Sequence, residues 1–84
     1  MFLHLGSDVM VPVKDILAIY DHKTMELAAN KKTLDMMMSE KEVVEITKEA
    51  KSYIFTDDKI YLSVISSLTL KKRAQSVKAM MAEK

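Results

Sequence analysis

Residue types that often hold a small domain together are scarce in this chain of 84 residues. It contains no cysteine, one glycine and one proline. The absence of cysteine excludes disulfide bridges and thiolate metal sites. A domain of this length buries only a modest share of its surface and is often marginally stable alone. We therefore expect association between subunits to add stability.

Long apolar segments are also absent. No apolar run reaches the length needed to cross a bilayer, and the few apolar residues at the N-terminus follow no basic segment. We expect no signal peptide, no membrane contact and a cytoplasmic location. Hydrophobic residues make up 49% of the chain and charged residues 30%, which is typical of a folded, soluble protein. Residues 1–84 are expected to form a single domain.

The charge is distributed unevenly, although the net charge is only +1. Residues 71–84 contain five basic residues and one acidic residue, a net charge of +4, whereas residues 1–70 contain eight and eleven, a net charge of −3. A polycation that binds nucleic acid through bulk charge is thereby excluded. Any nucleic-acid site must be a local basic patch.

Apolar runs in the first quarter of the chain predict three strands. The runs 2–5 and 9–11 are separated by Gly6-Ser7-Asp8, which is typical of a tight hairpin turn because glycine adopts a positive φ without strain. Residues 16–20 are apolar throughout, long enough for a buried strand and too short for a helix.

Residues 23–38 predict a helix, with Thr24 as a candidate N-cap. Apolar residues lie on two sides of it: Leu27, Leu34 and Met38 on one, and Met25, Ala29 and Met36 nearly opposite. Two apolar stripes imply two surfaces to cover, so this helix is a candidate for a subunit contact. Met25, Met36 and Met38 are expected to pack in the core or at that contact, whereas for Met80 and Met81 such packing and a place on the surface near the terminus both stay open.

The second half of the chain predicts a strand, a hairpin and a helix. Residues 43–46 form a short β-prone run, and the runs 53–55 and 60–62 are joined by a polar turn. Ser66 and Ser67 are good N-caps for a final helix, whose apolar positions are Leu70, Ala74, Val77 and Met81. The expected fold is α+β: a small, mostly antiparallel sheet packed with two helices.

Residues that could support catalysis or metal binding do not form a motif. His4 and His22 have no nucleophile motif near them, and there is no glycine-rich phosphate loop. Asp57 and Asp58 lie in a turn, where acids are common, and lack the spacing of a calcium loop. A packing or hydrogen-bonding role is favoured for His4. We expect no enzymatic activity, no metal and no cofactor.

Two parts of the sequence together resemble one known family. The segments concerned are His4-Leu5-Gly6, Val11-Pro12, Ala18-Ile19-Tyr20-Asp21, Thr56-Asp57, Tyr61-Leu62-Ser63, Ile65-Ser66-Ser67, Thr69-Leu70 and Lys72-Arg73. They resemble the bacterial extracellular-matrix regulators RemA and RemB, and RemB more than RemA. The resemblance covers nearly the whole chain. Val64 departs from it, since the family pattern has proline there, which would fix φ at the end of the strand.

The resemblance implies a transcriptional regulator of biofilm matrix genes whose subunits form a closed ring and bind double-stranded DNA. Carried over by position, its DNA-binding residues are Lys14, Lys48 and Lys51. The family loop is rich in arginine, whereas here Glu49 interrupts it. Lysine pairs with phosphate but lacks the planar fork that reads guanine edges, so we expect contact with the DNA backbone. Solvated lysines without a ligand are the alternative.

Lys72 and Arg73 belong to the basic run of the last helix and to the family-like pattern. They are candidates for phosphate binding or for ion pairs with the acidic body of a neighbouring subunit, and a solvated face is the third interpretation. Two functional hypotheses follow. The chain is a DNA-binding, ring-forming regulator, or it is an interaction protein that assembles with itself or with a RemA-like partner and binds little DNA.

Overall fold

The computed structural model describes the backbone of residues 1–82, and side chains in this range except those of residues 28, 29 and 76–82. The predicted helix positions Ala29, Val77 and Met81, and also Met80, therefore lie outside the described side chains.

The N-terminal hairpin has the predicted turn. β1 (Phe2–Gly6) pairs antiparallel with β2 (Val9–Pro12). Gly6 has a φ of 114° and Ser7 a φ of 50°, values that glycine tolerates best. Nε2 of His4 lies 2.6 Å from the carbonyl oxygen of Ser7 and can donate to it across the turn. His4 thus has the hydrogen-bonding role that the sequence favoured.

A second sheet of four strands has the order β3-β5-β6-β4. After a short 3-10 turn, η1 (Val13–Asp15), β3 (Ala18–Asp21) pairs antiparallel with β5 (Ser52–Phe55), and β5 with β6 (Lys59–Ser63). β4 (Glu42–Glu45) pairs with β6 in parallel. The α+β class and the mostly antiparallel pairing are confirmed.

The prediction of a single sheet is wrong. The β1–β2 hairpin forms a sheet of its own because it packs face to face against the larger sheet. Its inward residues Leu3, Leu5 and Val11 are buried in one core with Ile19 and Ile54 of that sheet. A face-to-face contact buries these side chains, whereas extending the sheet at its edge would leave one side of them open.

The predicted helix over residues 23–38 is instead two helices, α1 (His22–Met25) and α2 (Ala28–Glu40). Leu27 separates them with extended dihedrals (φ −62°, ψ 142°), and the side-chain amide of Asn30 donates to the carbonyl oxygen of Thr24 (2.9 Å), which satisfies that carbonyl at the break. Thr24 is not the N-cap, because the carboxylate of Asp21 accepts from the Lys23 N–H (2.9 Å) and begins the helix earlier.

The corner between β6 and α3 (Ser67–Ala82) is built by serines. The hydroxyl of Ser66 accepts from the Thr69 N–H (3.2 Å), which confirms it as the N-cap. The hydroxyl of Ser63 accepts from the Ile65 N–H (3.0 Å). The strand therefore ends at Ser63 although Val64 replaces the proline of the family pattern.

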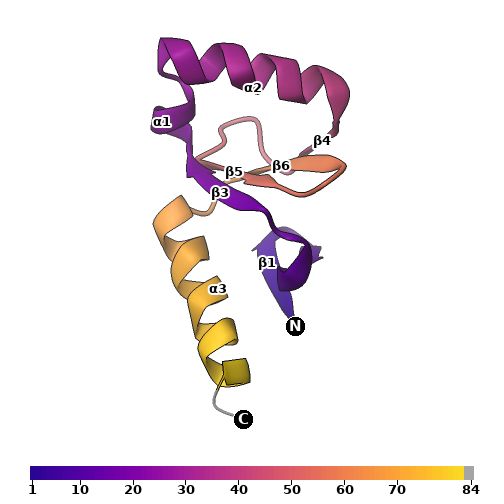
Figure 1. Cartoon of the computed structure of the whole chain (residues 1–84), viewed down its shortest axis with the longest axis vertical. Coiled ribbons are helices and arrows are strands. Elements are labelled where there is room, and N and C mark those ends of the chain that lie inside the picture. Colours follow the sequence, from indigo (N-terminus) through magenta and orange to yellow (C-terminus); the bar gives the residue numbers. More distant parts are fainter. Residues whose placement is uncertain (83–84) are drawn as a thin grey trace.

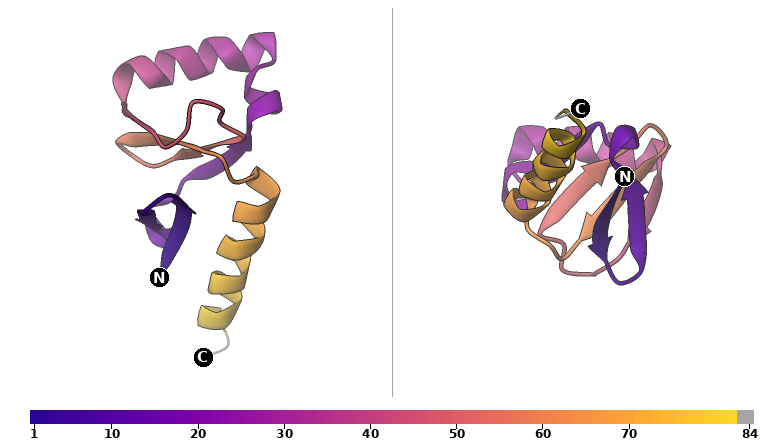
Figure 2. Two further views of the ribbon diagram at one scale, coloured as in Figure 1. Left: turned by 180° about the vertical axis from the view of Figure 1, so that it is seen from behind. Right: turned by 90° about the horizontal axis from the view of Figure 1, so that it is seen from below.

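The molecule has three layers, with the larger sheet in the middle. α2 covers one face, and the β1–β2 hairpin and α3 lie side by side on the other (Figures 1 and 2). Alternation along β5 supplies both cores, because Tyr53 and Phe55 join a cluster with Met25 and Leu34 of the helices while Ile54 faces the hairpin.

The two apolar stripes predicted for residues 23–38 do not form two surfaces. Met25 and Leu34 both enter the core, and Met38 packs against it. Leu27 and Met36 are each 62% exposed. The break at Leu27 turns α1 relative to α2, so positions that were opposite on one long helix reach the same core.

Candidate nucleic-acid interface

The loop that joins β4 to β5 carries two of the predicted DNA-binding residues, Lys48 and Lys51. Both ends of the loop are held to β6: the Ile46 N–H donates to the carbonyl oxygen of Leu62 (3.1 Å), and the Lys51 N–H to that of Ser63 (2.8 Å). Both lysine side chains are exposed. Ile46 and Ala50 of the loop pack against the two cores, so the loop holds its backbone against the fold and leaves the two ammonium groups exposed.

The start of α3 lies at the same end of the sheet as this loop. The hydroxyl of Ser52, the residue after Lys51, donates to the carbonyl oxygen of Ile65 (2.7 Å), two residues before α3 begins. Lys72 and Arg73 are exposed in the second turn of the helix, roughly 8–9 Å along its axis from Ser67. The structure thus places four of the five predicted residues on adjoining segments.

Lys14 lies apart from the loop lysines. It belongs to η1, which precedes β3, whereas Lys51 accepts at its carbonyl oxygen from the N–H of His22, just after β3 (3.0 Å). The length of β3, about 13 Å from Ala18 to His22 at a rise of 3.3 Å per residue, separates the two ends. One subunit therefore does not gather Lys14 and the loop lysines into one patch.

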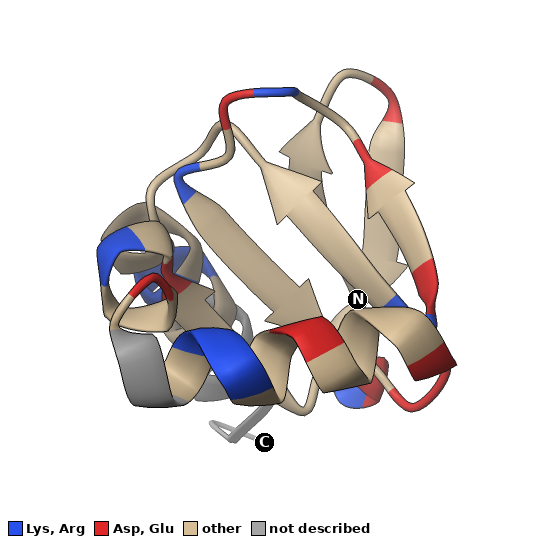
Figure 3. Ribbon diagram, turned by 90° about the horizontal axis from the view of Figure 1, so that it is seen from above, with Lys and Arg blue, Asp and Glu red and all other residues tan. Residues whose placement is uncertain are grey.

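The predicted DNA-binding side chains have no ion pair with any other residue whose side chain is described. Lys31 contrasts with them, since its ammonium lies 3.7 Å from Asp35 and 3.5 Å from Glu26, and these two carboxylates, Asp35 above all, raise its pKa. The loop lysines have no such carboxylate partner among the described side chains, so they can bind an external anion. Figure 3 shows that one acidic position also lies on the same loop, as expected from Glu49.

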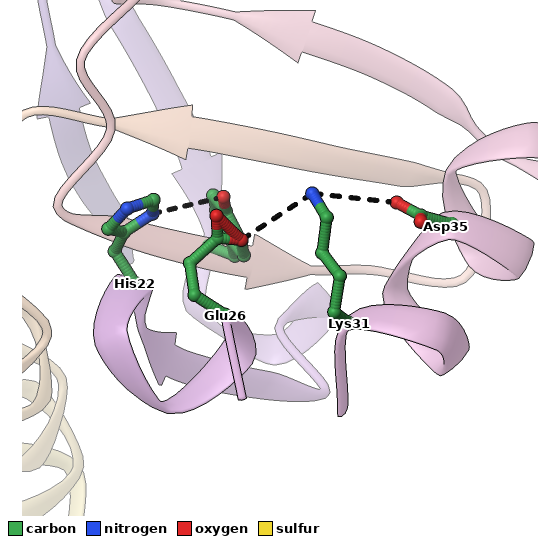
Figure 4. Close-up of polar contacts among 5 residues, drawn as sticks. His22, Glu26, Lys31 and Asp35 are labelled. Carbon is green, nitrogen blue, oxygen red and sulfur yellow. Dashed lines mark hydrogen bonds and ion pairs between the residues drawn. The ribbon is translucent and has the colours of Figure 1, made fainter. Parts of the chain in front are cut away.

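A second polar group lies between α1, α2 and β5 (Figure 4). Nδ1 of His22 lies 3.1 Å from the hydroxyl of Tyr53, and the two rings meet edge to face at 5.8 Å. Burial, with a smaller effect of Glu26, raises the pKa of Tyr53. The contact between His22 and Tyr53 joins the start of α1 to β5, so the group fastens this helix to the sheet.

An acidic cleft is the feature that sequence reasoning missed. It has a volume of about 550 Å³ and is lined by residues of β2, η1 and the β5–β6 turn, including the carboxylates Asp15, Asp57 and Asp58. More than 40 positions separate Asp15 from the other two, so no local pattern could reveal it. Within residues 1–82 no group of three histidine, aspartate or glutamate residues is arranged to hold a metal ion.

None of the helices in the described part of the chain is long and apolar enough to span a membrane. Fold and site define a small α+β domain that presents unpaired lysines beside the start of its last helix.

Comparison with known proteins gives the family. The profile of the RemA-like family, described as extracellular matrix regulatory protein A-like, matches residues 2–74. Extracellular matrix regulatory protein B of Bacillus subtilis (strain 168) is 39% identical over 75 residues, which cover 89% of this chain and 91% of that protein. The chain belongs to the RemA-like family of extracellular-matrix regulators, as the resemblance predicted. These relatives are named as regulators and not as enzymes.

Proposed function

We propose that this protein is a DNA-binding transcriptional regulator of extracellular-matrix genes. It acts in the cytoplasm as a ring-shaped homo-oligomer, and the β4–β5 loop and the start of α3 contact the DNA backbone through Lys48, Lys51, Lys72 and Arg73. Lys14, at the other end of β3, is a separate contact. The protein has no catalytic role.

One observation supports this function above the others. In a member of a matrix-regulator family, the loop between β4 and β5 is anchored at both ends to β6 and presents Lys48 and Lys51 to solvent without an ion pair among the described side chains. A lysine that is already exposed and unpaired meets a phosphate without losing another partner. The free energy of that contact comes mainly from the release of counterions.

A single subunit binds DNA weakly on this basis. Two to four phosphate contacts give a steep dependence on salt, and Glu49 between the two lysines repels the DNA backbone. Several identical patches on one ring act together through their effective concentration, so that the oligomer binds where the monomer does not. Contacts of lysine with phosphate carry little sequence information, and selectivity in this proposal comes from DNA shape and curvature.

The second candidate function is an interaction protein that assembles with itself or with a RemA-like partner and binds little DNA. The specific observation in its favour is the charge of the loop, because Lys48 and Lys51 are accompanied by Glu49 and no arginine. Without arginine the loop lacks the bidentate contacts that make phosphate binding strong.

A double substitution, Lys48→Ala with Lys51→Ala, tests which of the two candidate functions is correct. Retardation of a duplex is measured at several salt concentrations, and the oligomer mass by size exclusion with light scattering. If the loop binds DNA, the affinity at low salt should fall on the order of tenfold or more, and the salt slope should decrease by about 0.9 for each phosphate that is no longer neutralised. The oligomer mass is expected to stay unchanged.

The matched control is Lys23→Ala with Lys32→Ala, on α1 and α2. Both lysines are exposed, and the control variant has the same net charge as the test variant, so it separates the position of the charge from its total. Equal affinities of the test variant, the control and the unchanged protein would refute DNA binding by this loop and support the interaction protein.

A further inference from the structure

The outer face of the β1–β2 hairpin is an apolar surface that the described part of the chain leaves uncovered. Phe2 and Met10 are 58% and 57% exposed. In the hairpin register Phe2 lies opposite Pro12 and His4 opposite Met10, so these side chains share the face that points away from the core. Two large apolar side chains, Phe2 and Met10, with Pro12 beside them on one face of a two-stranded sheet, constitute an unpartnered surface.

This face continues into the acidic cleft. Pro12 lies on the hairpin face and also lines the cleft, and Tyr61 of β6 lines it as well. Asp15, Asp57 and Asp58 line the same cleft and are exposed, against one cation in the lining, that of Lys59. An apolar wall beside carboxylates fits a side chain with an apolar stem and a cationic head, which lysine and arginine provide.

The exposed side of α3 carries the complementary features. Leu68 is 65% exposed, and Lys71 and Lys72, three and four residues further on, lie on the same side of the helix. Leu70, which points the opposite way, is fully buried against the sheet. The outer side of α3 therefore presents an apolar side chain with two cations one turn away.

We propose that these two surfaces bind each other in different copies of this chain. Leu68 of one copy lies on the hairpin face at Phe2 and Met10, and Lys71 and Lys72 enter the acidic cleft. Apolar side chains meet apolar side chains, and two cations meet a cleft with an excess of carboxylates. This inference rests on the assembly in the proposed function and names the surfaces that would make it.

The contact joins two different surfaces, so a subunit that has used one of them still has the other free. Such head-to-tail contacts repeat, and they form a ring when the rotation between neighbours closes. The inference also divides the basic residues by role. Lys72, a DNA contact in the proposed function, is assigned by this inference to the subunit contact instead, and Lys48, Lys51 and Arg73 remain for DNA.

A charge exchange between two variants tests the contact. The cleft variant is Asp15→Lys with Asp57→Lys, and the helix variant is Lys71→Glu with Lys72→Glu. Each variant alone repels its own copies, and we expect self-association to weaken on the order of tenfold or more, so that the mass measured by light scattering falls toward the 9.6 kDa of one chain. An equimolar mixture regains opposite charges at each mixed contact, and its mass is expected to rise again.

Neutral variants and circular dichroism show whether a loss of association comes from the charges or from a change of fold. Asp15→Asn with Asp57→Asn, and Lys71→Gln with Lys72→Gln, remove the attraction without adding repulsion, and each is expected to weaken association less than the reversed variant does. Circular dichroism checks that all four variants keep the secondary structure of the unchanged protein. If the reversed variants keep the unchanged protein's mass, or if the mixture gains nothing over either variant alone, the proposed contact is refuted.

The test of the subunit contact and the test of DNA binding can give opposite results, so each proposal can fail without the other. Mass restored in the mixture, together with no DNA retardation by the unchanged protein, would keep the contact and reject the DNA-binding function. DNA retardation by the unchanged protein, without any effect of the charge exchange on mass, would keep the function and reject the contact.

Discussion

Removing the hydroxyl of Ser63 is expected to destabilise the fold at the junction of its layers. The Ser63 side chain is fully buried. Its hydroxyl donates to the carbonyl oxygen of Leu5 (2.6 Å) in the hairpin and accepts from the N–H of Ile65 (3.0 Å) in the corner before α3. Alanine at this position would leave both backbone groups without that partner, in a site where water has little access.

The magnitude follows from the two hydrogen bonds. Each contributes about 1 kcal/mol, and a buried group left unpaired costs more, so Ser63→Ala should lower the free energy of unfolding by about 2–3 kcal/mol. With a urea m-value of about 1 kcal/mol/M for a chain of this size, the midpoint should fall by about 2–3 M. Urea unfolding followed by circular dichroism gives this value, at one fixed protein concentration because association also stabilises the folded chain.

Two further serine-to-alanine variants serve as comparisons for the loss of stability in Ser63→Ala. Ser52 is also fully buried, but its hydroxyl makes a single bond, to the carbonyl oxygen of Ile65 (2.7 Å), so Ser52→Ala should cost about 1 kcal/mol. Ser39 is exposed on α2, and Ser39→Ala should change stability by less than about 0.5 kcal/mol. If Ser63→Ala proves no more destabilising than Ser39→Ala, the hydroxyl does not join the layers.

Two other predictions concern the core beneath α2. Leu34 is 1% exposed, so Leu34→Ala should lower the free energy of unfolding in urea by about 2–5 kcal/mol, whereas Leu27→Ala, at a position that is 62% exposed, should change it little; equal effects would contradict the assigned core. Because burial raises the pKa of Tyr53 above the usual 10.0, the unfolded chain loses this proton first and stability should decline as the pH rises through 10 and the folded pKa. Tyr53→Phe should remove this part of the decline, and a variant with the same pH profile of stability as the unchanged protein would refute the shift.

Local signals in the sequence predicted much of the fold. Gly6 marked a turn that requires positive φ, and Ser66 marked the start of α3 with a hydroxyl that caps it. The β5–β6 hairpin was predicted from two apolar runs and the polar turn between them, and its strands pair as expected. Each of these features is decided by neighbours within a few residues, which is why a single sequence contains enough information to place them.

Features that depend on distant residues were not predictable. β5 has two edges, of which β3 takes one and β6 the other, and β4 pairs with the remaining edge of β6 and runs parallel to it. Whether β4 would pair with β5 or β6 depends on where β3 docks, although β3 lies far earlier in the chain. The break at Leu27 arises in the same way, since it brings Met25 and Leu34 into one core.

The predictions for the candidate site divide in the same way, into local features that the sequence predicts and groupings of distant residues that it does not. Exposed lysines next to a loop could be chosen from sequence and family resemblance, and Lys48, Lys51, Lys72 and Arg73 do lie on the surface. That Lys14 stands beside an acidic cleft at the other end of β3 required the fold, because the cleft combines η1 with the β5–β6 turn. The sequence therefore predicted which residues are exposed better than it predicted how they are grouped.

The strand order also has a consequence for synthesis of the chain. The two central strands of the larger sheet, β5 and β6, leave the ribosome after both of its edge strands, β3 and β4. Until residue 63 has emerged, β3 and β4 lack the partners they pair with in the finished sheet, and α2 has no completed sheet on which to bury Leu34. The β1–β2 hairpin, whose strands are adjacent in sequence, can form earlier. During translation, therefore, the larger sheet and the packing of α2 against it can form only after β5 and β6 have emerged.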